Sequence, residues 1–413
     1  MRQHSERCII AVSLMCFVVG CERDTLPPGE LLCKAARNGD LDRLRLLVEG
    51  GADVNAKTVN SVTALHVAAG RGDMQMSQFL VERGADVNAT DEWGQSPLRY
   101  AVRENRRDLV EWLIAKGADV NICKRSTTPL YVAAKSGYQE MAELLLSKGA
   151  QVDLAPDPGS TPLHAAAARC HTNIVKLLIT HGGNVNAGLP AHWTPLHQAV
   201  CAQRGAFTID TVRLLLREGA DIDAGHATGN TPLLFAIQCG NEEVARLLME
   251  HGANLNTATP KGETPLIASL EHPQHPLPKM AESLLTRGAR IDVSHTDFGT
   301  ALHIAARQGF PGIVQQLIAE GADINAKMTY GERPLHEAIR CCNTDVVRIL
   351  ISHGADINAV TQDWLSPLDV AYAVHAEDSN LVEIVRAAGG KEGRVLRRER
   401  KAVKPLPPAG PNE

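Results

Sequence analysis

A four-residue phrase, Thr-Pro-Leu-His or a close variant, recurs about every 33 residues through most of this 413-residue chain. Successive copies start 32 to 37 residues apart. A fixed period of this length predicts a stack of small repeats that bury their apolar faces against one another, rather than one globular core. The ten copies begin at Thr63, Ser96, Thr128, Thr161, Thr194, Thr231, Thr264, Thr300, Arg333 and Ser366.

Each phrase has the residues that begin a helix. Thr or Ser can accept a hydrogen bond from an amide of the first turn, and proline suits the first helical position because its missing N–H costs nothing there. A second apolar stretch follows, as in residues 174–179, with the spacing of one helical face. It ends at a glycine, which suits the left-handed conformation that closes a helix. These glycines are Gly51, Gly84, Gly117, Gly149, Gly182, Gly219, Gly252, Gly288, Gly321 and Gly354.

This pattern closely resembles the ankyrin repeat over roughly residues 30–390. The resemblance implies an all-α repeat solenoid of about eleven helix–turn–helix repeats with short β-hairpin loops. It also implies a hydrogen bond between the Thr and His of one phrase, as in Thr161 with His164 and Thr194 with His197. Residues 30–58 lack the phrase and the hairpin and resemble an N-terminal cap. Residues 366–390, with Asp369 in place of His, resemble a C-terminal cap.

Two repeats are longer than the others, and their extra residues are predicted to lie between the two helices. Residues 204–208 carry the first insertion, and residues 271–278, which contain three prolines, carry the second. Proline excludes a regular helix across the second insertion. Its two histidines, His272 and His275, lack further ligands nearby, so no metal site is expected. A tolerated insertion at an exposed turn is the simpler interpretation.

The first twenty residues do not belong to the repeats. A short polar segment with two arginines precedes a twelve-residue apolar run over residues 8–19, which is short for a bilayer crossing and typical of a secretory signal. The run ends Val-Val-Gly-Cys, which resembles the lipobox of bacterial lipoproteins. The resemblance implies lipid attachment at Cys21, residues 21–29 as a tether and a bacterial cell envelope location. A plain cleaved signal and an uncleaved segment remain alternatives.

Beyond the N-terminal segment, the cysteines form no framework. Seven remain, an odd number, without any Cys-x-x-Cys pair. This pattern disfavours an oxidising compartment and so weighs against export. These cysteines are Cys33, Cys123, Cys170, Cys201, Cys239, Cys341 and Cys342.

The repeat pattern stops at Lys391. Residues 391–413 carry seven Lys and Arg against three Glu, while the whole chain has a net charge of −5. A basic segment that ends in prolines is predicted to be disordered. It could contact an anionic partner, although a solvated tail is the simpler interpretation.

The sequence contains no sign of catalysis. It has no glycine-rich phosphate loop, no nucleophile elbow and no His-Glu-x-x-His motif. The phrase histidines recur at one position of the repeat, which indicates a structural role. A pI near 6.4 is not the basic footprint of a nucleic-acid binder. We therefore expect no enzyme, no cofactor, no metal and no nucleic-acid partner.

The resemblance places a protein partner along the hairpin tips and the exposed side of the first helices. Aromatic residues just before the phrase would lie at these tips, where aromatic side chains often anchor interfaces. Packing against the neighbouring hairpin is the alternative. These residues are Trp93, Trp193, Phe298, Tyr330 and Trp364.

A row of basic residues stands seven or eight positions after the start of the phrase, on the inner side of the first helix. We hypothesise a partner with an acidic surface, contacting the first four repeats; a merely solvated face is the alternative. The row consists of Arg71, Arg103, Lys135, Arg169, Arg307 and Arg340.

The sequence thus predicts a monomeric, non-enzymatic scaffold that binds a protein through its concave face and hairpin tips. It is expected to be exported and held at the membrane by a lipid on Cys21. The first alternative is a cytosolic regulatory or effector protein whose N-terminal segment is not cleaved. The second is an array that accompanies a separate catalytic subunit.

Overall fold

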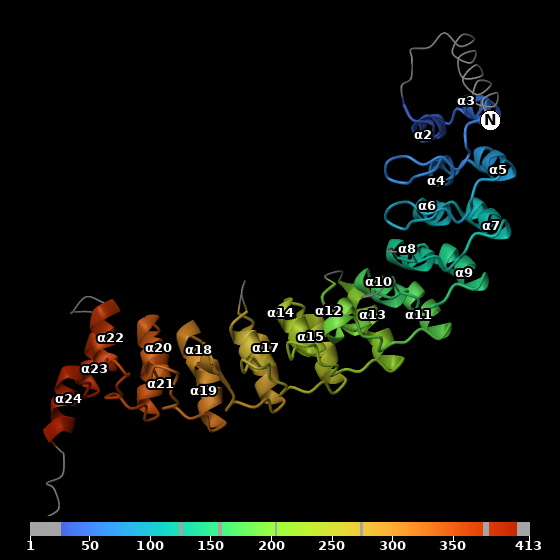
Figure 1. Ribbon diagram of the computed structural model, residues 1–413. Helices are drawn as coiled ribbons and strands as arrows, with labels where there is room; N and C mark the ends of the chain where they lie inside the picture. The colour runs from blue at the N-terminus through green and yellow to red at the C-terminus, as the bar shows by residue number, and fades with distance from the viewer. Residues whose placement is uncertain are drawn as a thin grey trace, which may run out of the picture. The chain divides into compact units, whose positions relative to one another are not determined.

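The computed structural model describes residues 26–123, 127–155, 159–202, 205–272, 276–374 and 380–402. Within these ranges, eleven pairs of antiparallel helices follow one another, and a single helix comes after the last pair (Figure 1). The chain divides into two compact parts, here called the N-terminal region, up to Asp221, and the C-terminal region, from Ile222. The predicted all-α repeat solenoid is confirmed.

In the N-terminal region, the first helices of successive repeats pack against each other in one layer, and the second helices form another layer (Figure 1). The first helices are α2 (Pro28–Asn38), α4 (Ala64–Arg71), α6 (Pro97–Arg103), α8 (Pro129–Ser136), α10 (Pro162–Ala168) and α12 (Pro195–Val200). The second helices are α3 (Leu41–Glu49), α5 (Met74–Glu82), α7 (Arg107–Ala115), α9 (Gln139–Ser147), α11 (Thr172–Thr180) and α13 (Ala206–Arg217), and the 3₁₀ helix η1 spans Pro190–His192.

The C-terminal region repeats the two-layer arrangement. Its first helices are α14 (Pro232–Gln238), α16 (Pro265–Leu270), α18 (Ala301–Gln308), α20 (Pro334–Arg340) and α22 (Pro367–Val374). Its second helices are α15 (Glu242–Glu250), α17 (Pro278–Thr286), α19 (Pro311–Ala319), α21 (Thr344–Ser352) and α23 (Asn380–Ala387). One hairpin contains the short antiparallel strands β1 (Ser294–His295) and β2 (Gly299–Thr300).

The phrase begins every first helix after α2, as predicted, and its Thr–His bond is confirmed. The Thr161 hydroxyl donates to Nδ1 of His164 over 2.8 Å, and Thr194 does the same to His197. The other ring nitrogen of His164 lies 3.1 Å from the carbonyl oxygen of Trp193, in the next repeat. In the repeats of His66, His164 and His303, the phrase therefore ties the repeat to its successor as well as closing its own first turn.

The core consists of thin layers of leucine, valine, isoleucine and alanine. Phrase leucines such as Leu163 and Leu302 are almost fully buried, and alanines beside them let the first helices approach closely. The predicted helix-ending glycines have positive φ, as in Gly84 and Gly354, both at 88°. Because no helix pair encloses these leucines alone, each layer depends on its neighbours.

An asparagine four residues after most of these glycines forms a second link between repeats, one that was not predicted from the sequence; after Gly149, Gly219 and Gly288 the position is aspartate. The Nδ2 of Asn88 donates to the carbonyl of Gly117 over 3.0 Å, and its Oδ1 accepts the N–H of Asp119 over 2.8 Å. Asn55, Asn121 and Asn186 make the same pair of bonds. The recurring Asp-x-Asn spacing was the available signal for this ladder.

The insertions differ in part from the prediction. The first one is not all loop, because α13 begins at Ala206 and residues 206–208 lengthen the second helix. In the second insertion, Pro278 occupies the start of α17, where a missing N–H is tolerated. His275 lies outside the described residues.

The predicted disordered tail is wrong over Gly393–Ala402, which form α24. The backbone N–H of Gly393 donates to Oδ2 of Asp369 over 2.8 Å, and a methyl group at Gly393 would come within 1.7 Å of the Trp364 carbonyl oxygen. Because Gly393 has no side chain, α24 can pack against the last repeat. Contacts with that repeat order a segment whose composition alone predicts disorder. Residues 403–413 lie outside the described residues.

The predicted signal segment, Cys21 and the first part of the tether also lie outside the described residues. None of the described helices combines the length and the apolar character needed to cross a membrane.

Candidate binding surface

Four members of the predicted basic row lie in the N-terminal region and are called here the N-terminal basic row: Arg71, Arg103, Lys135 and Arg169. Each ends, or directly follows, a first helix (α4, α6, α8 or α10), and all four are exposed. A cation here interacts favourably with the free carbonyls at a helix C-terminus. The repeat therefore brings these residues together on one layer of helices.

The N-terminal basic row has few carboxylates near it. The guanidinium of Arg71 donates to the backbone carbonyl of Arg37 over 2.6 Å, and Arg103 forms an ion pair of 3.0 Å with Glu104. About half of the Arg103 side chain is exposed, so water screens that pair strongly. Within the described residues, no ion pair engages Lys135 or Arg169, and the row presents positive charge to solvent.

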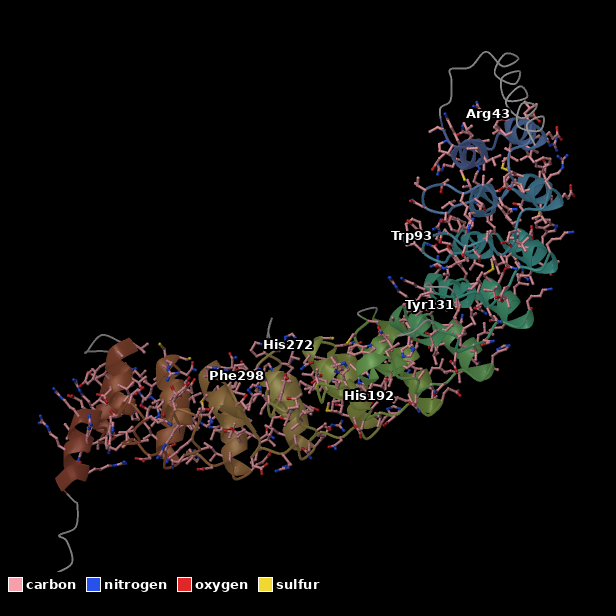
Figure 2. The ribbon with its side chains drawn as sticks, in the orientation of Figure 1. Arg43, Trp93, Tyr131, His192, His272 and Phe298 are labelled. Carbon is pink, nitrogen blue, oxygen red and sulfur yellow. The ribbon has the colours of Figure 1, made fainter. Side chains whose placement is uncertain are left out.

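An aromatic cluster lies beside Arg103. Its guanidinium lies 4.9 Å from the centre of the Tyr100 ring, a cation–π distance. The Tyr100 hydroxyl donates to Oδ2 of Asp91 over 3.1 Å, and burial, together with the Asp91 carboxylate, raises the pKa of Tyr100 to about 12. Trp93 lies at the hairpin before α6 with 49% of its surface exposed (Figure 2). An exposed aromatic tip thus adjoins the middle of the row.

Arg99 stands at the histidine position of its phrase, and the structure shows why this repeat needs no histidine. Its Nε donates to the carbonyl of Thr127 over 3.1 Å and its Nη2 to Oγ1 of the same residue over 3.0 Å. His66 reaches the equivalent carbonyl, that of Gln95, over 3.0 Å. Burial, followed by the charge of Arg103, lowers the pKa of Arg99. Arg99 is therefore a structural link rather than part of the exposed row.

The two members of the predicted row in the C-terminal region differ in their environment. Arg307 forms a partly buried ion pair with Glu271 and lies 5.1 Å from the ring centre of Phe298. Arg340 forms ion pairs with Glu332 over 2.8 Å and with Glu337 over 2.9 Å.

This charge cluster is partly buried, although Arg340 itself is 43% exposed. The Glu337 side chain is only 4% exposed, and burial raises the pKa of its carboxyl. Four carboxylates lie at or next to the first helices α16 and α20: Glu337 within α20, Glu271 at the end of α16, and Glu263 and Glu332 in the hairpins before these helices. The charges of Arg307 and Arg340 are thus balanced by carboxylates within the array.

The predicted tip aromatics fall into two groups. Tyr330, 65% exposed, resembles Trp93 in projecting to solvent. The other three, Trp193, Phe298 and Trp364, are half-buried, in line with the alternative that such side chains pack within the array. The Trp193 ring lies 5.4 Å from that of His197, and Phe298 stacks on His295 at 4.6 Å. Arg397 and Arg400 of α24 both lie 5.6 Å from the ring of Trp364.

The family follows from the whole arrangement of helix pairs, phrases and glycine turns. Models of the ankyrin repeat, single and in sets of three, match residues 32–124, 127–157, 152–225, 200–295 and 274–361. The chain belongs to the ankyrin repeat family. No curated protein matches it. Ankyrin repeats are in general protein–protein interaction modules, and proteins built from them are typically non-enzymatic scaffolds.

The buried histidines of these ankyrin repeats are neutral and hydrogen-bonded. Burial lowers the pKa values of His303 and His336 to about 4, and it also lowers those of His66 and His164. In the part of the chain that the structure describes, no group of three or more His, Cys, Asp and Glu side chains is placed to hold a metal ion.

Proposed function

We propose that this ankyrin array is a non-enzymatic scaffold whose N-terminal region binds the acidic surface of a partner protein. The N-terminal basic row is the observation that carries this proposal. Its four cations share one layer of helices, and Glu104 is the one carboxylate that pairs with them among the described residues. Matching charge on a partner would speed association and fix its register.

Trp93 supplies the apolar part of the proposed interface. Interfaces depend on a few anchors, among which tryptophan and arginine are enriched. The N–H of Glu92, next to Trp93, donates to the carbonyl of Asn60 over 3.0 Å, so this hairpin is held to the preceding one. An anchor held in place loses little conformational entropy on binding.

The test begins with affinity capture, using the full chain as bait, and then measures the affinity of the purified partner by calorimetry. Combined Arg103→Glu, Lys135→Glu and Arg169→Glu substitutions should weaken binding at least about tenfold, since each exposed pair contributes up to about 1 kcal/mol. The matched control reverses Lys116, Lys176 and Arg217, three exposed cations of the second-helix layer, and changes the net charge equally. Equal affinity of wild type and the first variant would refute the proposal.

We further propose that the chain is exported and anchored by a lipid on Cys21. The support is the sequence of the first 21 residues, an apolar run followed by Val-Val-Gly-Cys. Two or more acyl chains bind a bilayer stably, because each buried CH₂ contributes about 0.8 kcal/mol. Mass spectrometry of the mature N-terminus, after expression in a Gram-negative host, should find a lipidated Cys21. An unmodified Met1 would contradict this anchor.

The second candidate is a cytosolic regulatory or effector protein with the same binding surface. The support is the odd number of cysteines after the first 21 residues, seven, without any Cys-x-x-Cys pair, a pattern that favours a reducing compartment. Fractionation of cells that express a C-terminally tagged chain separates the two candidates. Tag in the membrane fraction supports the anchored scaffold, and tag in the cytosol supports the alternative.

A further inference from the structure

A groove lies between α24 and the hairpin that precedes α22. It encloses about 560 Å³. The hairpin contributes Trp364 and Leu365, and α24 contributes Arg394, Arg397 and Arg398. We call this feature the α24 groove; it combines two apolar side chains with three guanidinium groups.

The α24 groove is held in shape by contacts at both ends of the basic segment. The Lys391 N–H donates to Oδ1 of Asn358 over 2.8 Å, which extends the asparagine ladder past the last helix pair. Lys391 Nζ also forms an ion pair of 2.8 Å with Glu399, which lies eight residues later, within α24. With the bond from Gly393 to Asp369, these contacts fix α24 before any ligand arrives.

The charge in the α24 groove is not balanced internally. Asp369 is already bonded to Ser366 and Gly393, and Arg394 is paired with Glu392. Within the described ranges, no ion pair involves Arg397 or Arg398. Three guanidinium groups against two carboxylates, Asp363 and Asp369, give the lining a net charge of +1. Arg400, which lies beside Trp364, adds a further positive charge.

The apolar side of the α24 groove is partly open. Leu365 is 48% exposed, although the equivalent residue of the preceding repeat is Glu332, a carboxylate paired with Arg340. Trp364 is half-buried beneath Arg397 and Arg400. The last repeat thus has an exposed leucine and, within the described ranges, arginines without an ion pair at the position where the preceding repeat has the ion pair between Glu332 and Arg340.

We propose that the α24 groove binds an acidic peptide segment of a partner protein. Carboxylates of the segment contact Arg397 and Arg398, and an apolar side chain covers Leu365 at the edge of Trp364. A recessed, cation-flanked apolar surface suits a peptide better than a bilayer. Interfacial helices bind lipid through a continuous apolar face, whereas the exposed large apolar residue of α24 is Val395 alone, at 37%. This site is independent of the N-terminal basic row.

The experiment uses a short fluorescein-labelled peptide of alternating glutamate and leucine, with binding followed by anisotropy. The full chain carries Arg103→Glu, Lys135→Glu and Arg169→Glu throughout, so that the N-terminal basic row cannot contribute. In this background, Arg397→Gln with Arg398→Gln should weaken binding about tenfold, the loss expected for two exposed ion pairs. Arg287→Gln with Arg348→Gln, an equal charge change on the second-helix layer, should leave binding unchanged.

Three further measurements decide the interpretation. Bound peptide should alter the tryptophan fluorescence of the background chain, and Trp364→Phe should remove that change while circular dichroism shows intact helices. A peptide with lysine in place of glutamate should not bind. Failure of the acidic peptide to bind the background chain, or equal binding by the Arg397 and Arg398 variant, would overturn the proposal. Binding of anionic but not zwitterionic vesicles, lost with the same two substitutions while peptide binding persists, would assign the groove to lipid instead.

Discussion

In the N-terminal region, Arg71, Arg103, Lys135 and Arg169 end the first helices as exposed cations, whereas Arg307 and Arg340 in the C-terminal region lie against carboxylates at the same position of the repeat. The backbone and the residue type are alike in both regions. What differs is the carboxylates around the cation: Arg307 meets Glu271 of the preceding repeat, and Arg340 meets Glu332 and Glu337 of its own repeat. Ankyrin repeats can therefore leave one position largely unpaired and exposed in one region and pair it with carboxylates in the other.

The apolar cores of the two regions should respond alike to large-to-small substitutions, which have the largest expected effect on stability. Leu163→Ala in the N-terminal region and Leu302→Ala in the C-terminal region should each lower the free energy of unfolding by about 2–5 kcal/mol, through lost burial and the cavity that remains. Both leucines are at most 1% exposed. Urea melts measure the loss. No loss from Leu163→Ala would contradict its place in the stack.

Acid should destabilise the array through its buried phrase histidines. Burial lowers the pKa of His303 from 6.5 to about 4, so the unfolded chain binds more protons between these two values. The free energy of unfolding should therefore fall as the pH falls through this window, by up to about 3 kcal/mol for this one histidine. Melting temperatures of wild type and His303→Gln, taken from pH 7 to pH 4, measure it. Equal slopes for the two proteins would exclude the effect.

Removal of one cation from each region tests the comparison directly. Arg307→Ala should cost about 1–2 kcal/mol, because it leaves the half-buried Glu271 without its partner. Lys135→Ala should change the free energy of unfolding by less than about 0.5 kcal/mol, since exposed side chains contribute little. Urea melts of both variants give the two values. Equal costs would show that the cations of the two regions do not differ in their pairing.

The smallest effect is expected at Arg99, which occupies the histidine position of its phrase in the N-terminal region. Arg99→His restores the common phrase, and the new ring can reach the Thr127 carbonyl as His66 reaches that of Gln95. The change should cost less than about 1 kcal/mol, because one hydrogen-bonding group replaces another. A thermal melt checks this. A much larger loss would mean that the guanidinium contributes something beyond the link between repeats.

The fold could be predicted because its determinants are local. The phrase, the glycine turn and the apolar spacing lie within one repeat and recur, and Asp369 marked the last repeat. The pairing of the cations could not be predicted in the same way. Glu271 is 36 residues before Arg307, in a repeat whose length differs from the others, so the register of that contact depends on the fold. The order of α24 likewise depends on Gly393 meeting Trp364, a contact that composition does not reveal.

The bond between Asp369 and Gly393 also bears on how such a chain can grow by duplication. In several other repeats the fourth residue of the phrase donates a hydrogen bond to a carbonyl of the next repeat, as His164 does to that of Trp193, whereas Asp369 accepts one from the N–H of Gly393. A repeat copied in after Gly390 would set a carbonyl against that carboxylate, with oxygen facing oxygen. New repeats, whether they arise in evolution or by design, are therefore accommodated better between existing repeats than after Gly390.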